Sequence, residues 1–127
     1  MAVLQFQKLS PSDEGRQRQA ALLAFSAFSE LKHVFIVDED VDCFDINDVL
    51  WAINTRFQGD ADIITIPGVR CHPLDSSNDP SCSTSIRDHG IACKTIFDCM
   101  VPYDQKERFV RARFMDVEPE KWVKDAK

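Results

Sequence analysis

The first 66 residues carry alternating strand and helix patterns, and this order constrains the fold more than any other feature of the chain. Residues 33–37 form an unbroken apolar run rich in β-branched side chains, which predicts a strand covered on both faces. Residues 3–9 alternate apolar and polar side chains, and residues 62–66 give a third strand that Pro67 and Gly68 end. Two successive βαβ units nearly always wind into a parallel sheet. The predicted fold class is therefore α/β, a three-layer βαβαβ domain with a mainly parallel sheet and helices on its faces.

The two helices between these strands show amphipathic spacing. In residues 16–31 apolar side chains recur every three or four positions, and Ser12 or Asp13 can cap the first turn. The second helix can be capped by Asp45 or Asn47 and ends before Gly59. Its apolar stripe has the clearest helical spacing in the chain, with Ile46, Val49, Leu50, Ile53 and Phe57.

The remaining residues complete one domain, which we expect to span residues 1–127. A long loop, residues 69–90, follows the third strand, and residues 92–99 alternate again like a strand. Pro102 can open a further helix that runs to about residue 113, and residues 118–122 can form a short terminal helix. Ligands of open parallel sheets bind beyond the carboxyl ends of the strands. We therefore expect the informative loops to be residues 10–14, 38–45 and 67–77.

Composition narrows the class of partner. The chain has 15 Lys and Arg against 21 Asp and Glu, so its net charge is −6. A negative charge disfavours binding to nucleic-acid phosphates. The chain has no run of 18 apolar residues, and its first ten residues lack the pattern of a secretory signal. Its five cysteines include no Cys-x-x-Cys pair, which suits reduced thiols. We expect a cytoplasmic protein that binds neither nucleic acid nor membrane.

An acidic loop follows the second strand, with Asp38, Glu39, Asp40 and Asp42. It does not match a calcium-binding EF-hand, because Cys43 and Val49 stand where that loop needs Gly and Glu. A receiver-type phosphorylation site would need another Asp after the third strand, where the chain has Ile66 and Pro67. We expect these carboxylates to cap the next helix or to face solvent.

A metal site is also disfavoured. The possible ligands are spaced like no known zinc motif and include no close cysteine pair; they are Cys71, His72, Cys82, His89 and Cys93. His72 is the more informative residue, because it follows the third strand and its proton moves near neutral pH. Pattern alone therefore predicts an α/β domain with a loop that faces a ligand.

Five segments taken in order resemble a known family. They are residues 13–17, 31–42, 48–56, 66–68 and 94–99. Together they resemble the C-terminal domain of the UbiD family of decarboxylases, which use prenylated flavin mononucleotide. The likeness is closest to the branch that removes carbon dioxide from hydroxybenzoates such as protocatechuate or gallate, and it covers about residues 3–114.

The resemblance implies a carboxy-lyase in which this chain is the substrate-facing, oligomerising C-terminal domain. Family members are about four times longer, and a flavin-binding domain with the proton-handling glutamate and arginine residues precedes this one. That domain also binds a divalent metal and potassium. We therefore expect no cofactor on this chain alone, which should be catalytically silent without its flavin-binding partner domain, and we expect a homo-oligomer.

Residue roles follow the resemblance only at matching positions. It implies that His72 contacts the substrate hydroxyls or transfers a proton, with Leu74 near the aromatic ring and Pro73 beside it. Val3 and Gln5 match positions that approach the substrate. The family's phosphate-contacting lysine falls just before Met1, so no cofactor contact passes to Lys8 or Lys32.

Two other functions stay open at this point. One is a stand-alone interaction module that assembles with another subunit and binds no substrate. The other is a signalling domain phosphorylated at Asp38 or Asp40.

Overall fold

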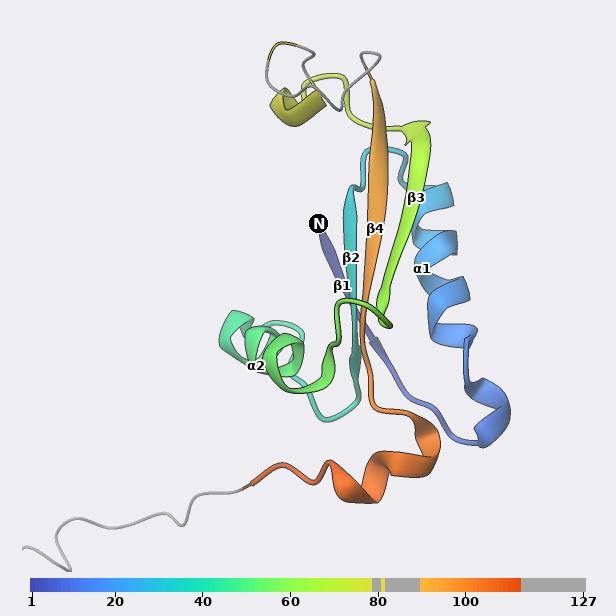
Figure 1. The fold of residues 1–127 in the computed structure, drawn as a ribbon, viewed down its shortest axis with the longest axis vertical. Helices are drawn as coiled ribbons and strands as arrows, with labels where there is room; N and C mark the ends of the chain where they lie inside the picture. The colour runs from blue at the N-terminus through green and yellow to red at the C-terminus, as the bar shows by residue number, and fades with distance from the viewer. Residues whose placement is uncertain (79–80, 82–89, 113–127) are drawn as a thin grey trace, which may run out of the picture.

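A four-stranded sheet forms the centre of the protein (Figure 1). The computed structural model describes residues 1–78, 81 and 90–112. The strands are β1 (Ala2–Phe6), β2 (His33–Asp38), β3 (Ile63–Arg70) and β4 (Ile91–Cys99), and their order across the sheet is β1-β2-β4-β3. β1, β2 and β4 run parallel, whereas β3 runs antiparallel to β4 at the edge.

Helices cover both faces of this sheet, which confirms the predicted three-layer α/β class. Helix α1 (Arg16–Ala27) lies on one face and α2 (Ile46–Arg56) on the other (Figure 1). None of the helices in the described part of the chain is long and apolar enough to cross a membrane. The long loop after β3 contains a 3-10 turn, η2 (Ser76–Asn78), and a second one, η3 (Tyr103–Arg108), follows β4.

Two apolar clusters, one on each face, hold the layers together. Burial of such side chains is the main favourable term in folding. The cluster under α1 consists of Ala21, Phe25, Val34, Ile36, Ile96 and Met100. The cluster under α2 consists of Val37, Val41, Val49, Ala52 and Cys99.

The direction of the third strand corrects the second predicted βαβ unit. Ile63 pairs with Phe97 near the carboxyl end of β4, and Arg70 pairs with Ile91 at its amino end. β3 therefore starts where β2 ends. The register shift at Gly68, whose φ is +71°, and the presence of Pro67 both suit an edge strand.

Helix boundaries differ from the predictions in three places. Helix α1 ends at Ala27, four residues early, and begins after Gly15 in the left-handed region at φ +86°, so neither Ser12 nor Asp13 is its N-cap. The Asp45 carboxylate does cap α2, accepting from the Asn47 backbone N–H. The segment after Pro102 is the 3-10 turn η3 and not a longer helix, and the helix predicted over residues 118–122 lies outside the described residues.

Candidate functional site

The antiparallel direction of β3 separates the loops that we expected to meet. Residues 10–14 and 38–45 follow β1 and β2, and both loops lie where the parallel strands finish, which we call the carboxyl edge of the sheet (Figure 1). The loop after β3 lies where the parallel strands begin, which we call the amino edge. The expectation that residues 67–77 share a crevice with the other two loops is therefore wrong. His72 and the acidic loop occupy opposite ends of the molecule.

The His72 loop has a defined local geometry. The Leu74 backbone N–H donates to His72 Nδ1 at 3.0 Å, and the Asp75 N–H donates to the His72 carbonyl at 3.1 Å. A neutral imidazole whose Nδ1 accepts a hydrogen bond carries its proton on Nε2. The loop thus fixes the His72 tautomer and leaves Nε2–H as the donor for a ligand.

Asp75 anchors this loop to the start of β2. Its carboxylate pairs with Lys32 Nζ at 2.8 Å and accepts from the Ser77 backbone N–H at 3.0 Å. The Lys32 and Ser77 hydrogen bonds lower the Asp75 pKa from its ordinary value of 3.8 to about 2. Asn78 is buried and contacts the Cys71 sulfur, which fixes the far end of the turn.

Leu74 lies next to His72 and is 84% exposed. Pro73 is also exposed, and both occupy the turn that follows His72. An apolar side chain held outward beside a polar donor can contact the flat face of an aromatic ligand while the donor meets its polar groups. The structure therefore brings His72, Pro73 and Leu74 together at one surface.

Half-buried aromatic side chains line the sheet face that α2 leaves partly open. Phe35 stacks on Phe97 at 4.4 Å between ring centroids, and Phe57 and His33 lie 5.6 and 6.1 Å from Phe97. The Nδ1 atom of His33 is buried and has no hydrogen-bond partner among the described residues, and burial lowers the His33 pKa. Val3 packs against the same face.

Sequence reasoning missed Lys32, His33 and Asp75. The available signal was the pair Lys32-His33 directly before the apolar run of residues 33–37. These residues can be assigned to the site only once it is known at which end of the sheet the loop after β3 lies. Gln5, which the resemblance places near the substrate, contacts the acidic loop in this structure. Its side-chain amide donates to the carbonyls of Val41 at 2.8 Å and Glu39 at 3.3 Å, in the acidic loop.

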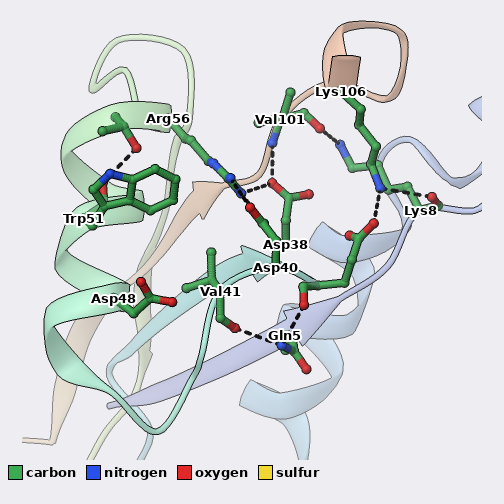
Figure 2. A network of polar contacts seen from close by, with 12 residues as sticks. Gln5, Lys8, Asp38, Asp40, Val41, Asp48, Trp51, Arg56, Val101 and Lys106 are labelled. Atoms are coloured by element: carbon green, nitrogen blue, oxygen red, sulfur yellow. Dashed lines mark hydrogen bonds and ion pairs between the residues drawn. The ribbon is translucent and has the colours of Figure 1, made fainter. Parts of the chain in front are cut away.

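At the carboxyl edge, a buried guanidinium organises the acidic loop (Figure 2). Arg56, at the end of α2, lies 2.7 Å from Asp38 and makes two contacts with Asp40 at 2.8 and 2.6 Å. Burial raises the Asp38 pKa, whereas the hydrogen bonds to Arg56 lower the Asp40 pKa. The prediction that these carboxylates face solvent holds for Glu39, Asp40 and Asp42, which are exposed. It does not hold for Asp38, which is 3% exposed.

The same edge holds the segment after β4. The Asp38 carboxylate accepts from the Val101 N–H at 2.9 Å, and Lys8 Nζ donates to the Val101 carbonyl at 2.9 Å (Figure 2). Lys106 pairs with Glu39 at 2.7 Å. Within the described residues no three acidic, histidine or cysteine side chains converge as metal ligands do. The acidic loop therefore has a structural role in this protein, where it holds α2 and the η3 segment on the sheet.

Comparison with known proteins identifies the family. Residues 1–99 match the model of the 3-octaprenyl-4-hydroxybenzoate carboxy-lyase C-terminal domain, UbiD_C. The chain belongs to the UbiD family. This match confirms the resemblance read from the five sequence segments.

Several UbiD relatives are close in sequence or structure. Gallate decarboxylase of Lactiplantibacillus plantarum is 54% identical over 126 residues, which are 98% of this chain and 26% of that protein. The solved 3,4-dihydroxybenzoic acid decarboxylase of Enterobacter cloacae is 60% identical, with a TM-score of 0.83 over 95% of this chain and 25% of that one. Anhydromevalonate phosphate decarboxylase of Methanocaldococcus jannaschii is 49% identical over 78 residues, which are 61% of this chain and 18% of that protein. The chain thus spans about a quarter of the length of the gallate decarboxylase and of the 3,4-dihydroxybenzoic acid decarboxylase.

Proposed function

We propose that this chain is the C-terminal, substrate-facing domain of a non-oxidative decarboxylase that acts on hydroxybenzoates with a prenylated flavin. The observation that carries the proposal is the fixed His72 tautomer beside the exposed Leu74. A hydroxybenzoate needs an apolar surface for its ring and a few placed polar groups for its hydroxyls. The identities of 54 and 60% to a gallate and a 3,4-dihydroxybenzoic acid decarboxylase favour this substrate class over the phosphorylated acid of the archaeal relative.

The described residues suit the substrate side of a flavin and do not suit its phosphate end. A solved UbiD-class enzyme from Pelotomaculum thermopropionicum, 27% identical with a TM-score of 0.75, is in complex with FMN. Here Lys32, a cation at the amino edge, is already paired with Asp75. We therefore assign the flavin phosphate, a divalent metal and potassium to the part of the relatives that this chain does not span.

In this proposal the chain's residues orient the substrate. A bound prenylated flavin supplies the electron sink for the charge left when carbon dioxide departs. His72 donates from Nε2–H to a ring hydroxyl or phenolate oxygen, and Leu74 contacts the ring. The Lys32–Asp75 pair holds the loop in this geometry, and correct placement of a reacting ring is itself a large part of catalysis. His33, the first residue of β2, directly follows Lys32, which anchors this loop through Asp75.

Partners and compartment follow from the surface. We propose that the chain assembles with its flavin-binding domain and with further copies, because apolar side chains are exposed on both helices; they include Leu22 and Leu23 on α1 and Ile46 and Leu50 on α2. The free thiols of Cys43, Cys71, Cys93 and Cys99 suit the cytoplasm.

A domain exchange tests the proposed function. This chain should replace the equivalent quarter of the Enterobacter cloacae enzyme, and the hybrid should be expressed with a flavin prenyltransferase. We expect carbon dioxide release from 3,4-dihydroxybenzoate and little from benzoate, which lacks the hydroxyls that His72 would contact. A hybrid that folds and binds flavin but releases no carbon dioxide from any hydroxybenzoate would favour the alternative, a non-catalytic interaction module.

A further inference from the structure

Lys94 is a buried cation on the sheet face opposite the aromatic cluster. It lies in β4, is only 4% exposed, and belongs to the face covered by α1. Its Nζ donates to the Ser29 carbonyl at 2.7 Å and lies 5.1 Å from the centre of the Phe25 ring. It forms no ion pair with any residue in the described part of the chain. Burial lowers the Lys94 pKa, as expected for an ammonium group without a counter-ion.

The surroundings explain how this ammonium group is tolerated. Ser29 follows the carboxyl end of α1, where the helix dipole favours a positive charge. The Phe25 ring adds a cation–π contact. An ammonium group has three N–H donors, however, and Ser29 provides the one acceptor found for Lys94 among the described residues. The ammonium group is therefore stabilised, but two of its three donors have no acceptor among the described residues.

Lys94 lines a cleft of about 300 Å³ between α1 and the β3–β4 pair. This volume is at the lower end of the range found for small-molecule sites. Four other lining residues are apolar, namely Leu22, Phe25, Ile66 and Val69. Ser26 and Ser29 carry hydroxyl groups, and Arg70 is basic. Arg70 is exposed and makes no ion pair with the residues that the structure describes. Arg70 pairs with Ile91, so its side chain leaves β3 on the face opposite Lys94. Among the described residues the cleft therefore combines apolar walls with one buried ammonium group and no lining carboxylate, in a protein of net charge −6.

We propose that this cleft is a second ligand site that binds a small monocarboxylate with a compact apolar body. The carboxylate would accept from Lys94 Nζ, and the apolar body would lie against Phe25, Leu22 and Val69. Hydrogen bonds between charged partners are the strong ones, most of all where water is excluded. The site is independent of the proposed decarboxylase function, because it lies on the other face of the sheet from the aromatic cluster and needs no cofactor.

Binding of benzoate to the 127-residue chain tests the proposal, with benzamide as the neutral analogue of the same shape. Calorimetry should show benzoate binding at least tenfold tighter than benzamide. NMR shift changes should concentrate on α1 and the β3–β4 pair. Lys94→Met, which keeps the side-chain length, should weaken benzoate binding at least tenfold and leave benzamide binding unchanged.

Two further variants make the result decisive. Leu22→Asp places a negative charge at the exposed wall of the cleft and should also weaken benzoate binding, which keeps the test available if Lys94→Met fails to fold. Arg108→Gln removes an exposed cation from η3 at the far end of the sheet and should have no effect. Equal binding of benzoate and benzamide, unchanged benzoate affinity in the Leu22 variant, or benzoate shifts confined to the His72 loop would overturn the proposal.

Discussion

At the residue scale, Arg56 shows how one buried charge can join distant parts of the chain. Its side chain is 3% exposed and links the end of α2 to Asp38 and Asp40, and Asp38 in turn accepts from the Val101 N–H after β4. Two buried charges are tolerated because each has a partner. Removal of Arg56 would leave the buried Asp38 carboxylate with the Val101 N–H as its one hydrogen-bond donor among the described residues.

We therefore predict that Arg56→Met lowers the free energy of unfolding by about 3 kcal/mol, the usual cost of breaking a buried ion pair. Urea unfolding followed by circular dichroism measures this change. The matched control is Arg16→Met, because the Arg16 side chain is 65% exposed in its pair with Asp13. Equal effects of the two substitutions would show that the Asp38–Arg56–Asp40 cluster does not stabilise the fold.

At the scale of elements, the sequence correctly predicts the helices and strands whose apolar pattern fits only one type of secondary structure. β2 has an unbroken apolar run, and α2 has both an apolar stripe and an Asp45 cap, and both lie where we predicted them. The direction of β3 could not be predicted, because the side-chain period of a strand is the same in parallel and antiparallel sheets. Its antiparallel pairing follows from where the chain leaves α2, beside the carboxyl end of β4.

This difference moves the candidate site from one end of the sheet to the other. The sequence indicated His72 and Leu74 through family resemblance, and the structure brings them together on one turn. It could not indicate Lys32 or Asp75 as supports, since they are 43 residues apart and meet only because β3 ends at the amino edge. The contact of Gln5 with the acidic loop could not be predicted either, because family resemblance indicated Gln5 without giving its partners; its role near the substrate stays a prediction.

At the scale of the whole molecule, carboxylates that lose a favourable interaction at low pH outnumber those that gain one. The pKa is lowered in five described carboxyl groups, Asp13, Glu14, Asp40, Asp48 and Asp75, and is raised in Asp38. A lowered pKa in the folded state means that the group stabilises the fold above its unfolded pKa, near 4, and that this contribution is lost as the pH falls. Asp38 has the opposite sign, because burial favours its protonated form.

The carboxyl groups together predict that the free energy of unfolding falls as the pH drops from about 4 toward 2. The lowered pKa of His33 adds an earlier decrease below about pH 6.5, and the raised pKa of Cys99 adds a decrease above about pH 9. Urea titrations at a series of pH values measure this dependence. Asp75→Asn should flatten the part of the curve nearest pH 2, because the pKa of Asp75 is lowered to about 2. Stability that rises below pH 4 would mean that the buried Asp38 outweighs the other five groups.

The most direct test of the central claim is the activity of His72→Ala in the hybrid enzyme, measured with 3,4-dihydroxybenzoate and compared with its flavin content. We predict a rate at least tenfold lower with the flavin content unchanged, because the variant loses the Nε2–H donor and keeps the rest of the fold. His72→Gln, which can still donate, should recover part of the rate. An unchanged rate in His72→Ala, or a loss of rate that parallels a loss of flavin, would contradict the claim that this loop orients the substrate.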